Sequence, residues 1–189
     1  MSSYSSHIGI VGGGISGLTA GCTLLEQGHK TVIFERSKEL NEHGAGISVS
    51  PNAIRILDKL HLKDEFINSS FSPENICFYY KNKKISHIKG DNGFVTSTRQ
   101  NLLQILYKKY IELGGEILFD HEFKTLKQNE IELIFTNNNK YKVSHILGCD
   151  GIKSSIRENF FPNSGEPVYS GYNAWRGTGK AKLMDGKVY

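Results

Sequence analysis

The chain has 189 residues, of which 38% are hydrophobic, 11% aromatic and 22% charged. This composition excludes a disordered chain, a fibrous protein and a mini-protein, and it predicts a globular chain with enough apolar material for one full domain and part of a second. The net charge is only +4 and the basic residues are spread along the chain, so we expect no nucleic-acid partner.

The N-terminal segment predicts a βαβ unit. Residues 7–11 form an apolar run of strand length that ends at three consecutive glycines. Apolar side chains then recur at helical spacing from Ile15 to Leu25, and Gly28 ends that helix. Residues 31–35 predict the next strand, which completes the unit.

Two further helices are predicted in the middle of the chain. Ser50 and Pro51 have the residue types of an N-cap and of a first helical position. A second helix begins near Thr98 and ends at the glycines of residues 114–115. Both have one apolar face, so we expect them to pack against a core.

A β-hairpin is expected between these two helices. Residues 75–80 and 84–88 are β-prone and are joined by a short polar link. The basic cluster of residues 81–84 predicts a solvated hairpin tip. Such an insert in an α/β pattern would offer a surface for a substrate.

The segment after the second helix predicts an antiparallel meander. It contains four β-prone runs separated by polar turns, which are residues 116–119, 121–127, 130–135 and 141–144. A further apolar run, residues 145–148, ends in Cys149-Asp150-Gly151. A short polar helix is expected after these residues.

A glycine motif follows the first strand and opens the first helix. In Gly12-x-Gly14-x-x-Gly17, the first glycine allows a tight turn, the second admits a pyrophosphate, and the third lets helix and strand pack closely. The first helical residues, Ile15 and Ser16, add backbone N–H groups at the positive end of the helix dipole. The motif therefore predicts dinucleotide binding.

Glu35 ends the second strand, 18 residues after Gly17, where a carboxylate is placed to accept hydrogen bonds from a ribose. The alternative is a ligand-free glycine-rich turn with a surface glutamate. The geometry suits NAD and FAD equally. Arg36 is placed either to approach a 2′-phosphate or to stack on adenine.

Cysteine usage indicates the compartment. Cys22, Cys77 and Cys149 are far apart, form no Cys-x-x-Cys pair and have no histidine at metal-ligand spacing. We expect reduced thiols, no metal and a cytoplasmic location. The N-terminus is polar and no stretch approaches the ~20 apolar residues that cross a bilayer, so we expect no targeting segment and no membrane partner.

Three later motifs carry a family resemblance. They are Gly44-Ala45-Gly46-Ile47-Ser48, Arg99 within Thr98-Arg99-Gln100-Asn101-Leu102, and Asp150-Gly151 followed by Ser154 and Arg157. With them the sequence resembles the group A FAD-dependent monooxygenases, the p-hydroxybenzoate hydroxylase-like aromatic hydroxylases. The resemblance extends over nearly the whole chain.

The resemblance implies a role for each motif. The three glycines of the first motif would hold the FAD pyrophosphate, Glu35 the adenosine ribose, and Arg99 the phosphate or ribityl side of the flavin. Asp150 would contact FAD and take part in the use of NADH or NADPH. The implied cofactor-binding residues are Gly12, Gly14, Ile15, Ser16, Gly17, Glu35, Arg36, Gly46, Arg99, Asp150 and Gly151.

Simpler interpretations remain for several of these residues. Arg99 is also compatible with a solvated surface arginine, and Asp150-Gly151 with a turn. Trp175 and Arg176 would lie beside the flavin ring by resemblance, or serve strand packing alone. The sequence contains no convincing catalytic triad or carboxylate pair, so hydrolase chemistry is not expected.

The expected fold is α/β, a Rossmann-like FAD-binding domain of the GR2 type with an antiparallel meander and the beginning of an interleaved β-sheet substrate domain. We assign the FAD-binding βαβ core to residues 1–70 and a hairpin insert of the substrate domain to residues 71–95. Residues 96–165 would complete the FAD-binding domain, and residues 166–189 would begin the substrate domain.

The family's second flavin motif, Gly-Asp-Ala followed by His and Pro, does not occur. Gly90-Asp91 precedes Asp150 and has the composition of a turn. We therefore expect a truncated chain, the N-terminal half of such an enzyme.

The expected function is the FAD-binding portion of an NAD(P)H-dependent monooxygenase that hydroxylates an aromatic or related small molecule with O2. The chain is also compatible with a homodimer. The alternatives are a non-catalytic nucleotide-binding or interaction module, and another FAD enzyme on the same scaffold, such as a prenyl reductase or a halogenase.

Overall fold

The computed structural model describes residues 4–40, 46–89, 93–127, 130–173 and 187–188. The chain divides into two compact units. The first contains Met1–Asn41 and Leu106–Asn173, and the second contains Glu42–Ile105 and Ala174–Tyr189. The predicted α/β fold is confirmed, while the four functional ranges assigned from the sequence stay a prediction.

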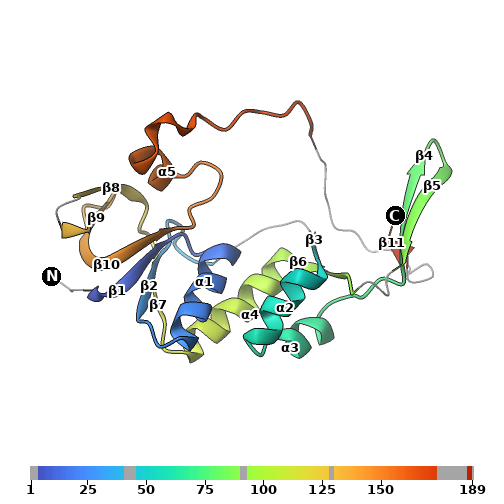
Figure 1. The fold of residues 1–189 in the computed structure, drawn as a ribbon, viewed down its shortest axis with the longest axis horizontal. Helices are drawn as coiled ribbons and strands as arrows, with labels where there is room; N and C mark the ends of the chain where they lie inside the picture. Colours follow the sequence, from blue (N-terminus) through green and yellow to red (C-terminus); the bar gives the residue numbers. More distant parts are fainter. Residues whose placement is uncertain (1–3, 41–45, 90–92, 128–129, 174–186, 189) are drawn as a thin grey trace. The chain divides into compact units, whose positions relative to one another are not determined.

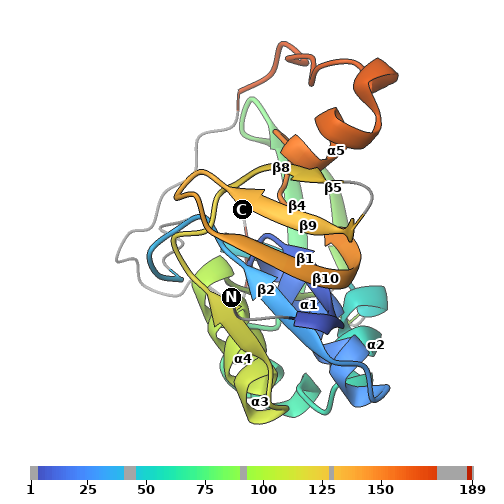
Figure 2. The same ribbon diagram turned by 90° about the vertical axis from the view of Figure 1, so that its left-hand side faces the viewer.

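A six-stranded mixed sheet forms the centre of the first unit (Figure 2). Its strands are, in spatial order, β7 (Glu116–Leu118), β2 (Thr31–Phe34), β1 (Tyr4–Val11), β10 (Lys140–Gly148), β9 (Glu132–Phe135) and β8 (Phe123–Lys127). The first four pair in parallel, and the last three form an antiparallel meander that shares β10. β2 is buried along its whole length, as expected for a parallel strand inside a sheet.

Two helices pack together in the first unit, α1 (Ile15–Glu26) and the C-terminal part of α4 (Arg99–Glu112), which lie side by side in Figure 1. Leu18 and Cys22 of α1 are fully buried, as are Leu106 and Tyr110 of α4. The Cys22 thiol donates a hydrogen bond to the carbonyl oxygen of Leu106 at 3.6 Å. The apolar faces predicted for both helices are thereby confirmed.

The parallel pairing brings four strand ends to one edge of the sheet. Val11 is in register with Phe34 on one side and with Gly148 on the other, and Phe34 is in register with Leu118. The loops that follow these residues therefore lie next to one another. The carboxyl edge of such a sheet is where ligands bind in open α/β folds.

The second unit is built from short elements. They are β3 (Gly46–Val49), α2 (Pro51–Lys59), α3 (Lys63–Asn68), β4 (Asn75–Tyr80), β5 (Lys83–Lys89), β6 (Val95–Thr98) and β11 (Lys187–Val188). β3 and β6 form an antiparallel ribbon, and the hairpin β4–β5 is extended by β11, which pairs in parallel with β4.

Several predicted features of this unit are confirmed. Ser50 is the N-cap of α2 and Pro51 its first residue. Lys81 and Asn82 both have positive φ angles, 44° and 61°, which is the geometry of a two-residue hairpin turn.

Four details differ from the sequence-based expectation. Residues 116–119 were expected to begin the antiparallel meander, but β7 pairs in parallel with β2 because α4 is the crossover that precedes it. Residues 141–148 form the single strand β10 instead of two strands. The strand expected from residue 121 begins at Phe123, and α3, β3 and β6 were not predicted.

Within the described ranges, no helix is long and apolar enough to span a membrane. In the same ranges, no cluster of three or more histidine, cysteine or acidic side chains suits a metal ion.

Candidate functional site

The glycine loop between β1 and α1 is shaped by backbone contacts that exclude side chains. Gly12 has φ +104°, and a Cβ atom there would lie 2.3 Å from the carbonyl oxygen of Cys149. A Cβ atom on Gly17 would lie 1.9 Å from the carbonyl oxygen of Gly12. Both glycines are therefore required by the fold of the loop itself.

Gly14 differs from these two glycines. A Cβ atom built on it would meet nothing within 4 Å. Gly14 is the N-cap of α1, no side chain caps this helix, and its first turn has no acidic residue. The N–H groups of the first turn have no partner inside the helix, so the space above Gly14 suits an anion such as a pyrophosphate.

The Glu35 carboxylate is held by two backbone N–H groups. Gly13 donates to Oε2 at 2.6 Å, and Ser37 donates to Oε1 at 2.8 Å. Each carboxylate oxygen keeps a further lone pair, so both can still accept a hydrogen bond from a ribose hydroxyl. Gly13 was not among the predicted residues, although it stands inside the run of three glycines, and a Cβ atom on it would lie 3.1 Å from Glu35.

The Asp150 carboxylate stabilises the loop that leads into α5 (Ser155–Phe160). Ser154 Oγ donates to Oδ1 at 2.6 Å, and the Ile156 N–H donates to Oδ2 at 3.0 Å. Ser154 is the N-cap of α5, where its Oγ accepts a hydrogen bond from the Arg157 N–H at 2.9 Å. The motif Asp150-Gly151 with Ser154 and Arg157 is thus one hydrogen-bonded loop, and Gly151 supplies its positive φ of 85°.

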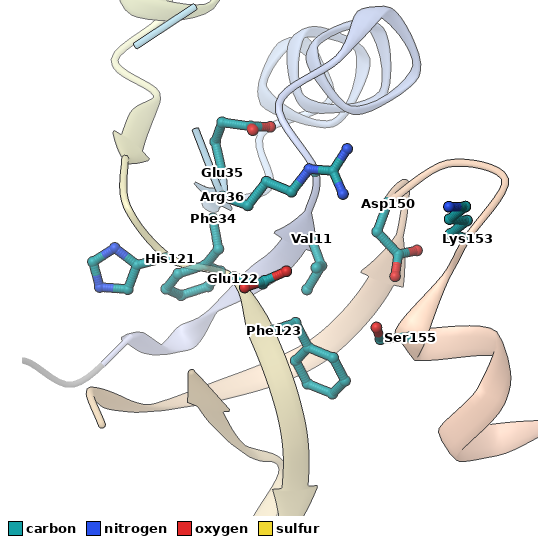
Figure 3. Close-up of a pocket in the computed structure, with 11 residues that line it drawn as sticks. Val11, Phe34, Glu35, Arg36, His121, Glu122, Phe123, Asp150, Lys153 and Ser155 are labelled. Atoms are coloured by element: carbon teal, nitrogen blue, oxygen red, sulfur yellow. The ribbon is translucent and has the colours of Figure 1, made fainter. Parts of the chain in front are cut away.

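These loops border one pocket (Figure 3). The lining residues are Val11, Gly12, Phe34, Glu35, Arg36, His121, Glu122, Phe123, Asp150, Lys153 and Ser155. The cavity volume is about 50 Å³, which is small beside the ~300 Å³ or more of a pocket that encloses a whole small ligand. The pocket would therefore hold only part of a dinucleotide, with the rest lying along the glycine loop.

The pocket carries charges of both signs. Figure 3 shows the side chains of Arg36 and Asp150 directed toward the space between their two loops, with Glu122 on the segment facing them. Burial and the neighbouring Asp150 carboxylate raise the pKa of the Cys149 thiol. Cys149 therefore stays protonated at neutral pH and serves packing.

Two predicted site residues, Gly46 and Arg99, belong to the second unit. Gly46 begins β3 and is in register with Thr98, the residue before Arg99. Thr98 Oγ1 accepts a hydrogen bond from the Asn101 N–H at 3.1 Å, as an N-cap does. The structure thus brings Gly46 next to the first turn of α4.

Some expectations concern residues outside the described ranges, namely Gly44, Ala45, Trp175, Arg176 and the pair Gly90-Asp91. Conversely, sequence reasoning missed several residues that line the pocket, including His121, Phe123, Lys153 and Ser155. Their signal was weak. Only the rule that ligands bind at the carboxyl ends of parallel strands would have selected the residues after β7, and that strand was expected to be antiparallel.

The family model described as "FAD binding domain" matches residues 5–166, which include the glycine loop, Glu35 and Asp150. The chain belongs to this FAD-binding domain family. The geometry agrees with that membership, since the open space at Gly14 and the uncapped helix end suit the pyrophosphate of FAD. Glu35 is tied to the same loop by the hydrogen bond that it accepts from the Gly13 N–H.

Characterised relatives of this FAD-binding domain are monooxygenases. A salicylate hydroxylase of Pseudomonas putida is 31% identical over 186 residues, which cover 90% of this chain and 42% of the relative. A 2,6-dihydroxypyridine 3-monooxygenase of Paenarthrobacter nicotinovorans is 27% identical and matches 100% of this chain and 46% of its own length. The chain thus spans less than half the length of these relatives.

Solved structures of oxygenases have a similar fold. The tetrameric form of 2-methyl-3-hydroxypyridine-5-carboxylic acid oxygenase superposes with a TM-score of 0.73 and 28% identity, over 79% of this chain and 40% of that one. A p-nitrophenol 4-monooxygenase of Pseudomonas putida has a TM-score of 0.74 over 82% of this chain and 43% of its own, but only 16% identity. The second likeness concerns the fold alone.

Proposed function

We propose that the protein containing this FAD-binding domain is a monooxygenase that uses FAD, NADH or NADPH, and O2 to hydroxylate a small aromatic molecule. The observation that carries the proposal is the glycine loop, open at Gly14 and set on an uncapped helix, in a chain of this family. The names of the relatives, a salicylate hydroxylase and a dihydroxypyridine monooxygenase, support the aromatic substrate class.

In this proposal the first unit holds the adenosine diphosphate part of FAD. The backbone of residues 12–17, including Ile15 and Ser16, binds the pyrophosphate. Glu35 accepts a hydrogen bond from the ribose, and Arg36 contacts a phosphate or the adenine face.

The remaining predicted residues serve the flavin side. Asp150 and Gly151 shape the loop across from Glu35. Gly46 and Arg99, which the sequence motifs assign to the flavin, stay proposed contacts. When bound, FAD would accept a hydride from the nicotinamide and activate O2. The protein's part is to hold the flavin against the substrate and to exclude water.

A titration with FAD, followed by flavin fluorescence, tests the first step. We expect Glu35→Gln to weaken FAD binding about tenfold, because an amide NH2 group would face the N–H of Gly13 or Ser37 and the ribose would lose a charged acceptor. The matched control is Glu74→Gln, which removes the same charge from an exposed position of the second unit. Equal affinities of all three proteins would contradict the role of Glu35.

Consumption of NADH and NADPH, together with oxygen uptake, tests the activity. We expect the FAD-loaded protein to oxidise one of the two coenzymes faster when a hydroxylated aromatic or pyridine compound is added, and to yield a product one oxygen atom heavier. An FAD-loaded protein that oxidises neither coenzyme with any such compound would overturn the proposal.

We also propose that the protein self-associates, because a related oxygenase has a tetrameric form. A homodimer is the simplest form, and gel filtration coupled to light scattering measures it.

A further inference from the structure

A buried histidine is part of the lining of the candidate FAD pocket. His121 is only 8% exposed and packs among Phe34, Phe135 and Tyr141, with ring centroids 5.1 to 6.0 Å from its own. A buried polar ring in an aromatic cluster is costly unless its nitrogens are hydrogen-bonded. Both nitrogens of His121 have such partners.

These partners determine how the ring is protonated. Nδ1 lies 2.6 Å from the carbonyl oxygen of Phe119, which can only accept, so Nδ1 carries the proton. Nε2 lies 3.1 Å from Asn139 Nδ2, an amide NH2 that can only donate, and 3.2 Å from the Tyr141 hydroxyl. Both ring nitrogens are thus engaged by groups of the protein itself.

The His121 ring stabilises a strained turn at Asp120. Asp120, between Phe119 and His121, has φ +60°, a left-handed conformation that costs free energy for a residue other than glycine. The bond from Nδ1 to the Phe119 oxygen spans this residue. The Asn137 side chain donates to the carbonyl oxygen of Asp120 at 2.6 Å and holds the turn from the other side.

The turn at Asp120 is hydrogen-bonded to the segment that carries Glu35. The His121 N–H donates to the carbonyl oxygen of Glu35 at 2.9 Å, and the Asp120 N–H donates to that of Ser37 at 3.0 Å. The Glu35 carboxylate then accepts from the N–H groups of Gly13 and Ser37. These hydrogen bonds connect His121, through the backbone and side chain of Glu35, to Gly13 of the glycine loop.

We propose that His121 is a positioning residue for FAD: by closing the left-handed turn at Asp120 it fixes the backbone of residues 35–37 and thereby the Glu35 carboxylate that meets the ribose. The inference rests on the proposed function, because the ribose contact of Glu35 belongs to it. The inference predicts that replacing His121 weakens binding of the adenosine part of FAD through the position of Glu35.

Three variants test this role. His121→Phe keeps the aromatic packing and removes both ring bonds, whereas His121→Asn keeps a donor near the Nδ1 position. Tyr141→Phe removes one partner of Nε2 and leaves the Nδ1 bond. We expect His121→Phe to weaken FAD and ADP binding about three- to tenfold, and the other two variants to stay within about twofold of the unmodified protein.

A second readout needs no ligand. Amide hydrogen exchange, followed by NMR, should become faster at Gly13 and Ser37 in His121→Phe and remain unchanged in Tyr141→Phe. Loss of tertiary stability alone would not select these two amides. If His121→Phe does not fold, His121→Gln, which places its amide near Nε2 and lacks the Nδ1 donor, takes its place with the same expectations.

FAD affinity and amide exchange in His121→Phe that both match the unmodified protein would overturn the inference, as would equal weakening in all three variants. Failure of the proposed function looks different. In that case the unmodified protein would bind neither FAD nor ADP, while the exchange rates at Gly13 and Ser37 would still decide the role of His121.

Discussion

Gly14 and Gly17 occupy the same loop, yet an added side chain would meet very different surroundings. At Gly17 a Cβ atom would collide with the backbone at the Gly12 carbonyl, whereas at Gly14 it would enter open space. Gly17 is thus required by the fold, and Gly14, whose φ of −72° suits any residue, is required only if a ligand approaches.

We expect Gly17→Ala to lower the free energy of unfolding by about 1–3 kcal/mol or more, because backbone atoms cannot move aside cheaply. Gly14→Ser should change it by less than about 1 kcal/mol, since serine is a preferred N-cap. The same Gly14→Ser should weaken FAD binding at least about tenfold, or ~1.4 kcal/mol. Urea unfolding and FAD titration measure the two effects. Unchanged FAD affinity in Gly14→Ser would contradict a pyrophosphate at this position.

At the scale of elements, Tyr110 joins α4 to the sheet. Its ring is fully buried, and Cβ atoms on Gly21 of α1 or on Gly115 would overlap it. Its hydroxyl lies 2.9 Å from Thr31 Oγ1 on β2 and donates to the Glu116 carbonyl oxygen on β7 at 3.3 Å. One side chain therefore links a helix to two parallel strands.

Burial raises the pKa of Tyr110 from 10.0 to about 12. The folded protein favours the neutral phenol, so this contribution to stability is complete below about pH 10 and is lost as the pH rises through about 12. Tyr110→Phe should cost about 1 kcal/mol at pH 7 and should lose less stability than the unmodified protein between pH 10 and 12.

Urea unfolding at pH 7, 10 and 11 measures this difference. Burial also raises the pKa of Cys22 to about 12, but Cys22 is present in both proteins and contributes to both curves. Parallel pH dependence of the two proteins would contradict the assignment to Tyr110.

At the scale of the whole molecule, ligand binding and stability are linked. Because the proposed adenosine diphosphate site is built from loops at the ends of β1, β2 and β10, a ligand there can bind only to the folded sheet. FAD at one hundred times its dissociation constant should therefore raise the free energy of unfolding by about 2.7 kcal/mol. ADP at the same multiple of its own constant should do likewise.

Thermal unfolding with and without ligand gives the comparison. Riboflavin, which lacks the adenosine diphosphate, should give a smaller rise in melting temperature than ADP at equal concentration. A larger rise with riboflavin would place the dominant contacts outside the first unit.

Local patterns in the sequence were enough to predict the βαβ unit, the glycine loop, the helix from Thr98 and the hairpin. Each of these depends on neighbours within a few residues: apolar spacing, an N-cap, a glycine that ends a helix, or a turn. The resemblance to FAD-dependent monooxygenases also followed from short motifs at a fixed order along the chain, and the family match confirms it.

Strand direction and shared loops were decided by the tertiary structure, because alternation of side chains is the same in parallel and antiparallel strands. Only folding shows that β7 joins the parallel sheet, that the His121 N–H donates to the carbonyl oxygen of Glu35, and that Asp150 accepts a hydrogen bond from the first turn of α5. The sequence by itself therefore determined that the chain belongs to an FAD-binding family. The packed sheet decided which residues, far apart in sequence, hold that site in shape.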